Sequence, residues 1–370
     1  MKKIIALPSP KRKNNRKKNH KRQPKLTVGM DLGDKKSRYC AVDAAGEIAK
    51  EDSVATTPAA LKERFGRMPR CRIAIEVGAH SRWVSQLLTS FGHAVIVANS
   101  RQLELISKSS RKSDRMDART LARMARVDPQ LLRPIRHRGE QAQLDLVNVR
   151  VRAQLVETRT RLVNAARGLA KSFGERLPAC DTDQFGSEQL DGLPEPLRQA
   201  LEPLAESVEQ FTAKIKALDE QLEQIAREHY PETELLTQVN GVGTLIALTF
   251  VLTIDDKKRF PKSRDVGCYV GLRPRQSASG QRDPDLPITK EGDTYLRTML
   301  VQAAHCILRE KAPDSDLKRA GQNIAGSSKN AKKRAVVAVA RKLAVLLHHL
   351  WAYGEVYEPL RSQGGDAMAA

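Results

Sequence analysis

A heptad pattern of apolar residues limits the possible folds of this chain more than any other feature of its sequence. Nine apolar residues are spaced alternately four and three apart: Leu197, Leu201, Leu204, Val208, Phe211, Ile215, Leu218, Leu222 and Ile225. This spacing predicts a coiled-coil helix of about 40 Å. An earlier set keeps the same register, with Asn148 and Thr158 at two positions: Leu144, Val151, Leu155, Leu162, Ala165 and Leu169. Because the intervening residues 173–194 are rich in Gly, Pro, Asp and Ser, the sequence predicts a helical hairpin over residues 139–230.

The segment before the hairpin, residues 26–138, has the element order of an α/β domain. Period-two alternation predicts strands at 26–31, 38–42 and 47–54, joined into an antiparallel meander. Predicted helices at 58–67 and 81–91 then alternate with predicted strands at 72–76 and 93–98. This is the element order of the RNase H fold, in which the first and fourth strands are neighbours. The sequence therefore predicts an RNase H-like sheet.

Four carboxylates fall where this fold would bring them together. Asp31 closes the first predicted strand, and Glu76 closes the fourth. Asp114 and Asp117 are three residues apart at the start of a predicted helix, which places them on one helix face. Clustered carboxylates are stabilised by a hard divalent cation, so the pattern predicts a metal site. The alternatives are a helix N-cap for Asp114 and a first-turn helix acid for Asp117.

The charge of the chain favours nucleic acid as its partner. The sequence contains 64 Lys and Arg against 43 Asp and Glu, a formal charge of +21. Residues 1–25 contribute eleven of the positive charges and no acidic residue, which predicts a disordered basic leader; a disordered tail is expected over residues 361–370. The remaining excess of about +10 still favours phosphate binding. The five cysteines are scattered without a Cys-x-x-Cys pair, which fits a reducing cytosol better than a zinc site or a disulfide framework.

Residues 231–360 form a further predicted domain with two motifs of interest. Gly241-Val242-Gly243 resembles the turn of a helix-hairpin-helix, in which backbone N–H groups at Gly241 and Gly243 meet a phosphate. A second segment places Ser277 and Ser279 in a loop among basic side chains that could contact phosphates: Arg273, Arg275, Lys290 and Arg297. The alternatives are a structural glycine turn and an ordinary polar loop.

Together these segments resemble the DEDD transposases of bacterial insertion sequences, the insertion-sequence one-ten family. The resemblance covers about residues 28–353. It rests on motifs in the family's order: Gly29-Met30-Asp31, Ile75-Glu76, Lys112 to Ala118, Gly241-Val242-Gly243, Gly271-Leu272-Arg273-Pro274 with Ser279-Gly280, and Tyr295-Leu296-Arg297.

This resemblance implies a RuvC-like first domain, a coiled coil that mediates assembly and a mainly helical C-terminal transposase domain that supplies a serine. It implies that Asp31, Glu76, Asp114 and Asp117 hold Mg²⁺, with Mn²⁺ as the alternative ion, and that Ser279 is the nucleophile. The implied partners are donor and target DNA, a structured noncoding guide RNA (the bridge RNA) and further copies of the chain in a dimer or tetramer. The expected location is the bacterial cytoplasm, on the nucleoid.

Two departures from the family pattern leave alternatives open. Ala278 precedes Ser279, and the acidic insert Asp283-Pro284-Asp285 follows it, so Ser277 is a reserve nucleophile. A RuvC-like Holliday-junction resolvase would use the same carboxylates with water as the nucleophile. A noncatalytic nucleic-acid-binding scaffold would leave the carboxylates without a role. The hairpin is either an oligomerisation arm or a structural spacer.

Overall fold

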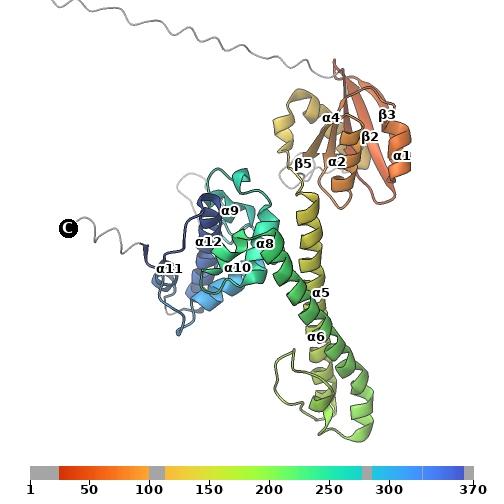
Figure 1. Ribbon diagram of the computed structural model, residues 1–370. Coiled ribbons are helices and arrows are strands. Elements are labelled where there is room, and N and C mark those ends of the chain that lie inside the picture. Colours follow the sequence, from red (N-terminus) through yellow and green to blue (C-terminus); the bar gives the residue numbers. More distant parts are fainter. Residues whose placement is uncertain (1–24, 100–112, 277–285, 327, 362–370) are drawn as a thin grey trace, which may run out of the picture. The chain divides into compact units, whose positions relative to one another are not determined.

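The described residues form two compact units, which divide between His137 and Arg138 (Figure 1). The computed structural model describes residues 25–99, 113–276, 286–326 and 328–361. The two candidate nucleophiles, Ser277 and Ser279, lie outside these described residues. Within them, the first unit is mixed α/β, and the regular elements of the second unit are helices.

The first unit is built on a five-stranded mixed sheet with the strand order β3-β2-β1-β4-β5. β1 pairs antiparallel with β2, β2 pairs antiparallel with β3, and β1, β4 and β5 run parallel to one another. The predicted strands are present, with ends shifted by at most two residues, and the first and fourth strands are neighbours as predicted. Their bounds are β1 Leu26–Asp31, β2 Lys36–Asp43, β3 Ile48–Ala55, β4 Arg72–Glu76 and β5 Ala94–Ala98.

Helices cover both faces of this sheet. α1 (Pro58–Phe65) and α2 (Ser81–Ser90) pack on the face that carries large side chains such as Met30. α4 (Asp114–Val127) packs on the other face, where the sheet presents small side chains such as Ala74. Small residues on one face let a helix approach the strands closely, and α4 contacts both β1 and β4.

The second unit begins with a helical hairpin and continues into a compact helical domain. In the hairpin, α5 (Glu140–Ser172) packs against α6 (Glu195–His229), as the sequence predicts. The domain that follows contains α7 Glu232–Thr237, α8 Thr244–Ile254, α9 Arg264–Tyr269, α10 Thr294–Ile307, α11 Asp316–Ile324 and α12 Lys329–Tyr353.

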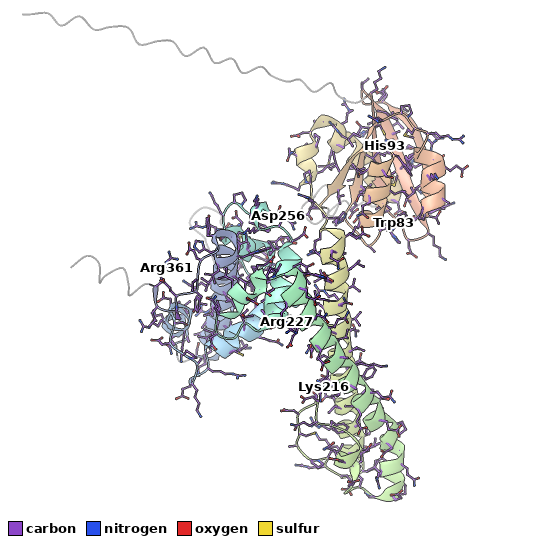
Figure 2. The ribbon with its side chains drawn as sticks, viewed as in Figure 1. Trp83, His93, Lys216, Arg227, Asp256 and Arg361 are labelled. Atoms are coloured by element: carbon purple, nitrogen blue, oxygen red, sulfur yellow. The ribbon has the colours of Figure 1, made fainter. Side chains whose placement is uncertain are left out.

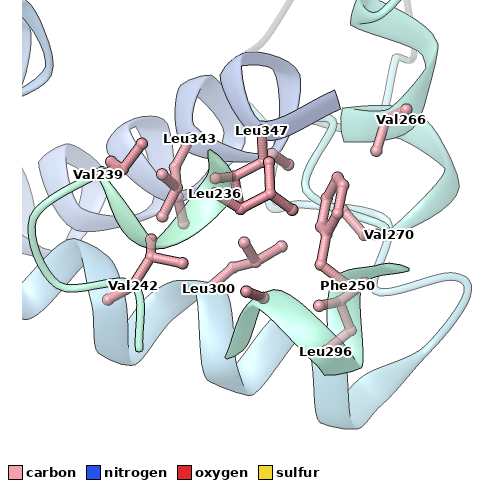
Figure 3. Close-up of a cluster of buried hydrophobic side chains, with 14 of the residues drawn as sticks. Leu236, Val239, Val242, Phe250, Val266, Val270, Leu296, Leu300, Leu343 and Leu347 are labelled. Carbon is pink, nitrogen blue, oxygen red and sulfur yellow. The ribbon is translucent and has the colours of Figure 1, made fainter. Parts of the chain in front are cut away.

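Apolar side chains from α7, α8, α9, α10 and α12 form the core of this domain. Leu236, Phe250, Leu300, Leu343 and Leu347 meet at its centre (Figure 3). In the described part of the chain, α12 supplies the one helix, over residues 330–353, that is long and apolar enough to cross a membrane by length and composition. More than half of its apolar window is buried in the protein, as in the core helix of a folded domain.

On α6 the buried face is rotated slightly from the predicted seam. Five of the nine predicted positions are buried: Leu197, Leu201, Val208, Ile215 and Leu222. The other four are partly exposed, and three of them are followed by a residue that is buried instead: Ala205, Thr212 and Ala226. These neighbours have short side chains, so α6 can approach its partner closely along this line.

On α5 the predicted seam is wrong. Three of its positions face away from the protein interior, because Leu144, Val151 and Leu169 are 56%, 45% and 49% exposed. With Val147, these three residues form what we call the outer stripe of α5. The buried face lies beside it: Leu146, Val149, Val163, Ala166 and Ala170.

Two buried polar residues explain why the buried face of α5 could not be predicted from the sequence. Asp145 accepts a hydrogen bond of 2.7 Å from the hydroxyl of Tyr230, and Arg159 donates one of 3.2 Å to Thr212. Charged residues are normally expected to face solvent, so Asp145 and Arg159 made the buried face of α5 look like a solvent-exposed one. The heptad count therefore selected the outer stripe.

Candidate active site

Asp31 and Glu76 lie at the ends of two neighbouring parallel strands. The register pairs Met30 of β1 with Ile75 of β4, so each carboxylate is the next residue on its strand. Adjacent strands are about 4.8 Å apart, and parallel strands end at the same sheet edge. Both residues are partly buried. The topology therefore places these two acids side by side, as the sequence predicts.

Gly29 allows α4 to pack directly onto β1 beside these acids. A Cβ atom at Gly29 would lie 2.2 Å from the carbonyl oxygen of Ala118 and 2.3 Å from the amide nitrogen of Ala122. No side chain fits in that space, so only glycine permits the approach. The residue before Ala118 on this helix is Asp117, which is 6% exposed. The helix that packs on β1 thus carries a buried acid in its first turn.

Asp114 differs from Asp117 in its surroundings, although both belong to the first turn of α4. The helix is capped by Ser113, whose hydroxyl accepts from the amide of Met116 at 3.4 Å. Asp114 is the first helical residue and is exposed. The expected N-cap alternative for Asp114 is therefore wrong, and the two acids do not share one environment.

The four acids supply the donor type that a hard divalent cation prefers, but they do not form a closed group. All four lie in the described part of the chain, and there no three His, Cys, Asp or Glu side chains are close enough to hold one metal ion. The arrangement instead pairs the acids of β1 and β4, and Asp117 is a separate buried acid on α4. Carboxylate oxygens suit Mg²⁺ or Mn²⁺ chemically.

Glu51 on β3 fastens the first two turns of α4 to the sheet. Its carboxylate accepts from Arg115 at 2.8 Å and from Arg119 at 2.7 Å, with a further short contact to each arginine. The hydrogen bonds from Arg119, opposed by partial burial and reinforced by Arg115, lower the pKa of Glu51 to about 2. This clamp was missed in the sequence, because nothing local links Glu51 to residues 64 and 68 positions away.

A hydrogen-bonded chain connects the loops that follow β1 and β4. Nε1 of Trp83, which is labelled in Figure 2, donates to Nδ1 of His80 at 3.1 Å, and Nε2 of His80 lies 3.2 Å from the carboxylate of Asp34. The sequence analysis assigned no role to these residues. Their positions in the sequence could have indicated this contact, since Asp34 follows the strand that ends at Asp31 and His80 follows the strand that ends at Glu76, each by a few residues.

In the second unit, two paired segments flank the stretch that contains Ser277 and Ser279. The amide of Arg275 donates to Pro287 at 3.0 Å, and the amide of Thr289 donates to Arg273 at 2.9 Å. Among the four predicted phosphate contacts, Arg273, Arg275 and Lys290 are exposed.

Arg297 is held by the protein itself. Its guanidinium donates to the carbonyl oxygens of Val270 at 3.1 Å and Glu291 at 3.0 Å. These bonds brace the loop before α10, where Gly292 has a φ of +78° and a Cβ would lie 1.9 Å from Tyr269. Arg297 thus has a structural role here, and its phosphate contact stays a prediction.

The predicted glycine turn lies between α7 and α8. Gly241 has a φ of +82°, and a Cβ there would lie 2.9 Å from the carbonyl oxygen of Ala303 on α10. Gly243 is the N-cap of α8, and its Cβ position faces open space. Gly241 is therefore required by packing, whereas Gly243 leaves room for another molecule at the helix start.

Two family models match this chain. The DEDD model, described as transposase, matches residues 28–174, and a model described as transposase of the IS116/IS110/IS902 family matches residues 233–318. A probable family 20 transposase of Pseudomonas aeruginosa is 26% identical over 90% of this chain and 98% of that protein. The transposase for insertion sequence element IS1111A of Coxiella burnetii is 27% identical over 89% of this chain and 90% of that protein. The transposase for element IS1328 of Yersinia enterocolitica is 27% identical over 77% of this chain and 85% of that protein.

Proposed function

Because this chain belongs to the IS110 family of insertion-sequence transposases, we propose that it cuts and rejoins DNA through a serine-linked intermediate at a carboxylate-held divalent ion. The observation that carries the proposal is the parallel pairing of β1 with β4, which brings Asp31 beside Glu76. The strand order β3-β2-β1-β4-β5 also supports an RNase H-like (RuvC-like) fold for the first unit. A coiled coil for the hairpin stays a prediction.

Asp31, Glu76 and Asp117, with Asp114 at the start of α4, would hold Mg²⁺ or Mn²⁺. When bound, the ion would neutralise charge on the scissile phosphate and on the leaving oxygen. Glu51 would keep the helix acids in place through Arg115 and Arg119. Residues of this kind orient ligands without touching the substrate.

Ser279 would supply the nucleophile. Its hydroxyl oxygen forms a bond to phosphorus, the bond from phosphorus to the leaving strand's oxygen breaks, and the proton passes to that oxygen. The phosphoserine ester conserves the phosphodiester bond energy. A hydroxyl of a second strand can then reverse the step, which joins new DNA ends without an external energy source.

We propose donor and target DNA, a structured noncoding guide RNA and further copies of the chain as partners. The charge of +21 supports nucleic-acid binding, and the outer stripe of α5 supports assembly into a dimer or tetramer. With these partners, the proposed location is the bacterial cytoplasm, on the nucleoid. Loss of cleavage after ribonuclease treatment would support the guide RNA, and light scattering would give the number of copies.

Substitution of the strand acids tests the metal site. We expect Asp31→Asn and Glu76→Gln each to lower strand cleavage by about 100-fold or more, since one lost ligand weakens the ion's hold while the basic surface persists. DNA binding by mobility shift should stay within a factor of two or so of the parent protein. Glu47→Gln, an exposed acid in the turn before β3, is the matched control and should cleave normally. Full cleavage by Asp31→Asn would contradict the proposal.

Two serine variants separate transposition chemistry from water-driven cleavage. Ser279→Ala should abolish the covalent protein–DNA band in denaturing electrophoresis with labelled DNA, and Ser277→Ala should retain it. The reverse result would move the nucleophile to Ser277. If both variants cleave normally, the Holliday-junction resolvase with water as nucleophile is the correct function.

A further inference from the structure

A groove of about 820 Å³ runs along α12 in the second unit. One wall is α12 itself, and the other is formed by the two paired segments around Arg273–Arg275 and Pro287–Thr289. Its floor is apolar, with Leu272, Pro274, Ile288 and Val337 among the lining residues. None of the four proposed metal ligands lines this groove.

The charged residues that line the described part of the groove are all basic. Lys333 and Arg334 line one end of the α12 wall and Arg341 and Lys342 the other, and none of the described lining residues is acidic. Lys333 and Lys342 are exposed. Lys333 and Arg341 are eight residues apart, which is about 12 Å along a helix. One small anion cannot span that distance, so the spacing favours an extended polyanion.

The apolar floor narrows the choice among polyanions. A duplex presents its phosphates outward and keeps its base faces stacked inside. A single strand presents phosphates and unstacked bases together, which suits a surface that combines cations with apolar side chains. The chemistry of this groove therefore fits a single-stranded nucleic acid.

The residues that line the groove indicate which nucleic-acid strand it would bind. Pro274 and Leu286 both line it, and they lie on either side of the stretch that contains Ser279. We propose that the groove along α12 binds the single DNA strand next to the phosphate that Ser279 attacks. This inference rests on the proposed serine chemistry for the choice of strand, but the binding itself needs no cleavage.

Charge removal at the groove gives the first test. The full-length Lys333→Gln/Lys342→Gln protein should bind a labelled single-stranded oligodeoxynucleotide about tenfold more weakly, and the slope of log affinity against log salt should fall by about 1.4, as for two lost phosphate contacts. The matched control is Lys214→Gln/Lys216→Gln, two exposed lysines on α6, of which Lys216 is labelled in Figure 2. Equal losses in the two double variants would overturn the proposal, because they would reflect overall charge alone.

An uncharged change at the floor gives the second test. Val337→Ser keeps the charge and removes apolar surface, so we expect weaker strand binding with an unchanged salt slope and an unchanged melting temperature within a few degrees. Unchanged affinity would overturn the apolar part of the site. An RNA oligonucleotide of the same sequence is run in parallel, and a loss confined to RNA would assign the groove to RNA instead of DNA. If Ser279→Ala leaves cleavage intact, the serine proposal fails while these binding results keep their meaning.

Discussion

Two single residues control how the candidate site is assembled. Gly29 sets the distance between β1 and α4, and Glu51 sets the position of α4 along the sheet. The strand acids could be predicted, because Asp31 and Glu76 each end a strand with regular alternation. The Glu51 clamp could not, because its partners meet it only after the helix has packed on the sheet.

Gly29→Ala adds only one methyl group, but it should clearly lower the stability of the first unit. The added methyl group would meet the α4 backbone at 2.2 Å, so α4 must move away from β1. Such overpacking costs about 1–3 kcal/mol, and cleavage should fall with it because Asp117 moves with the helix. Gly78→Ala, where a Cβ meets nothing within 4 Å, is the control and should change stability by less than about 0.5 kcal/mol in urea denaturation.

The Glu51 clamp also predicts a pH dependence of stability. The folded-state pKa of about 2 is below the ordinary value of 4.5, so the ionised carboxylate stabilises the folded state above about pH 4.5. That contribution should be lost as the pH falls from about 4.5 towards 2. Glu51→Gln should therefore be less stable than the parent at pH 7, and the difference should shrink in acid. A difference that stays constant from pH 7 to pH 3 in denaturant titrations would contradict the clamp.

At the scale of elements, the hairpin shows what periodicity can and cannot decide. The heptad pattern predicted two paired helices, and they are present. It could not decide which stripe of α5 faces α6, because that helix has apolar residues on two faces. Burial raises the pKa of Tyr230, and its bond to Asp145 raises it further, which keeps the phenol protonated as the donor of that bond. The choice of face thus depended on a polar pair that no spacing rule counts.

Two valines on α5 provide a matched test of this orientation. Val149 is fully buried, whereas Val151 is 45% exposed and lies on the predicted seam. Val149→Ala should lower the free energy of unfolding by about 2 kcal/mol, from lost burial and a residual cavity. Val151→Ala at low protein concentration should cost less than about 0.5 kcal/mol. The opposite ranking in chemical denaturation would restore the seam predicted from the heptads.

At the scale of the whole molecule, charge is the property that sequence alone describes most completely. The total charge of +21 follows from the sequence alone. A structure is needed to show which positive charges lie on a particular surface such as the α12 groove. Removal of residues 1–24 takes away ten positive charges and no acidic residue. We expect the shortened protein to bind random duplex DNA more weakly near 50 mM salt, with a smaller salt slope. An unchanged slope would show that the leader makes no phosphate contacts.

The outer stripe of α5 has a consequence for how the element behaves in a cell. If a second copy covers Leu144, Val147 and Val151, folding and assembly share one equilibrium, and stability rises with the number of molecules present. A cell with one weakly expressed copy of the gene would then hold mostly unassembled protein, exposed to proteases. Doubling the gene dosage would more than double the amount of assembled protein. The rate of transposition would then rise more than in proportion to expression, so an element that is rarely expressed would seldom transpose.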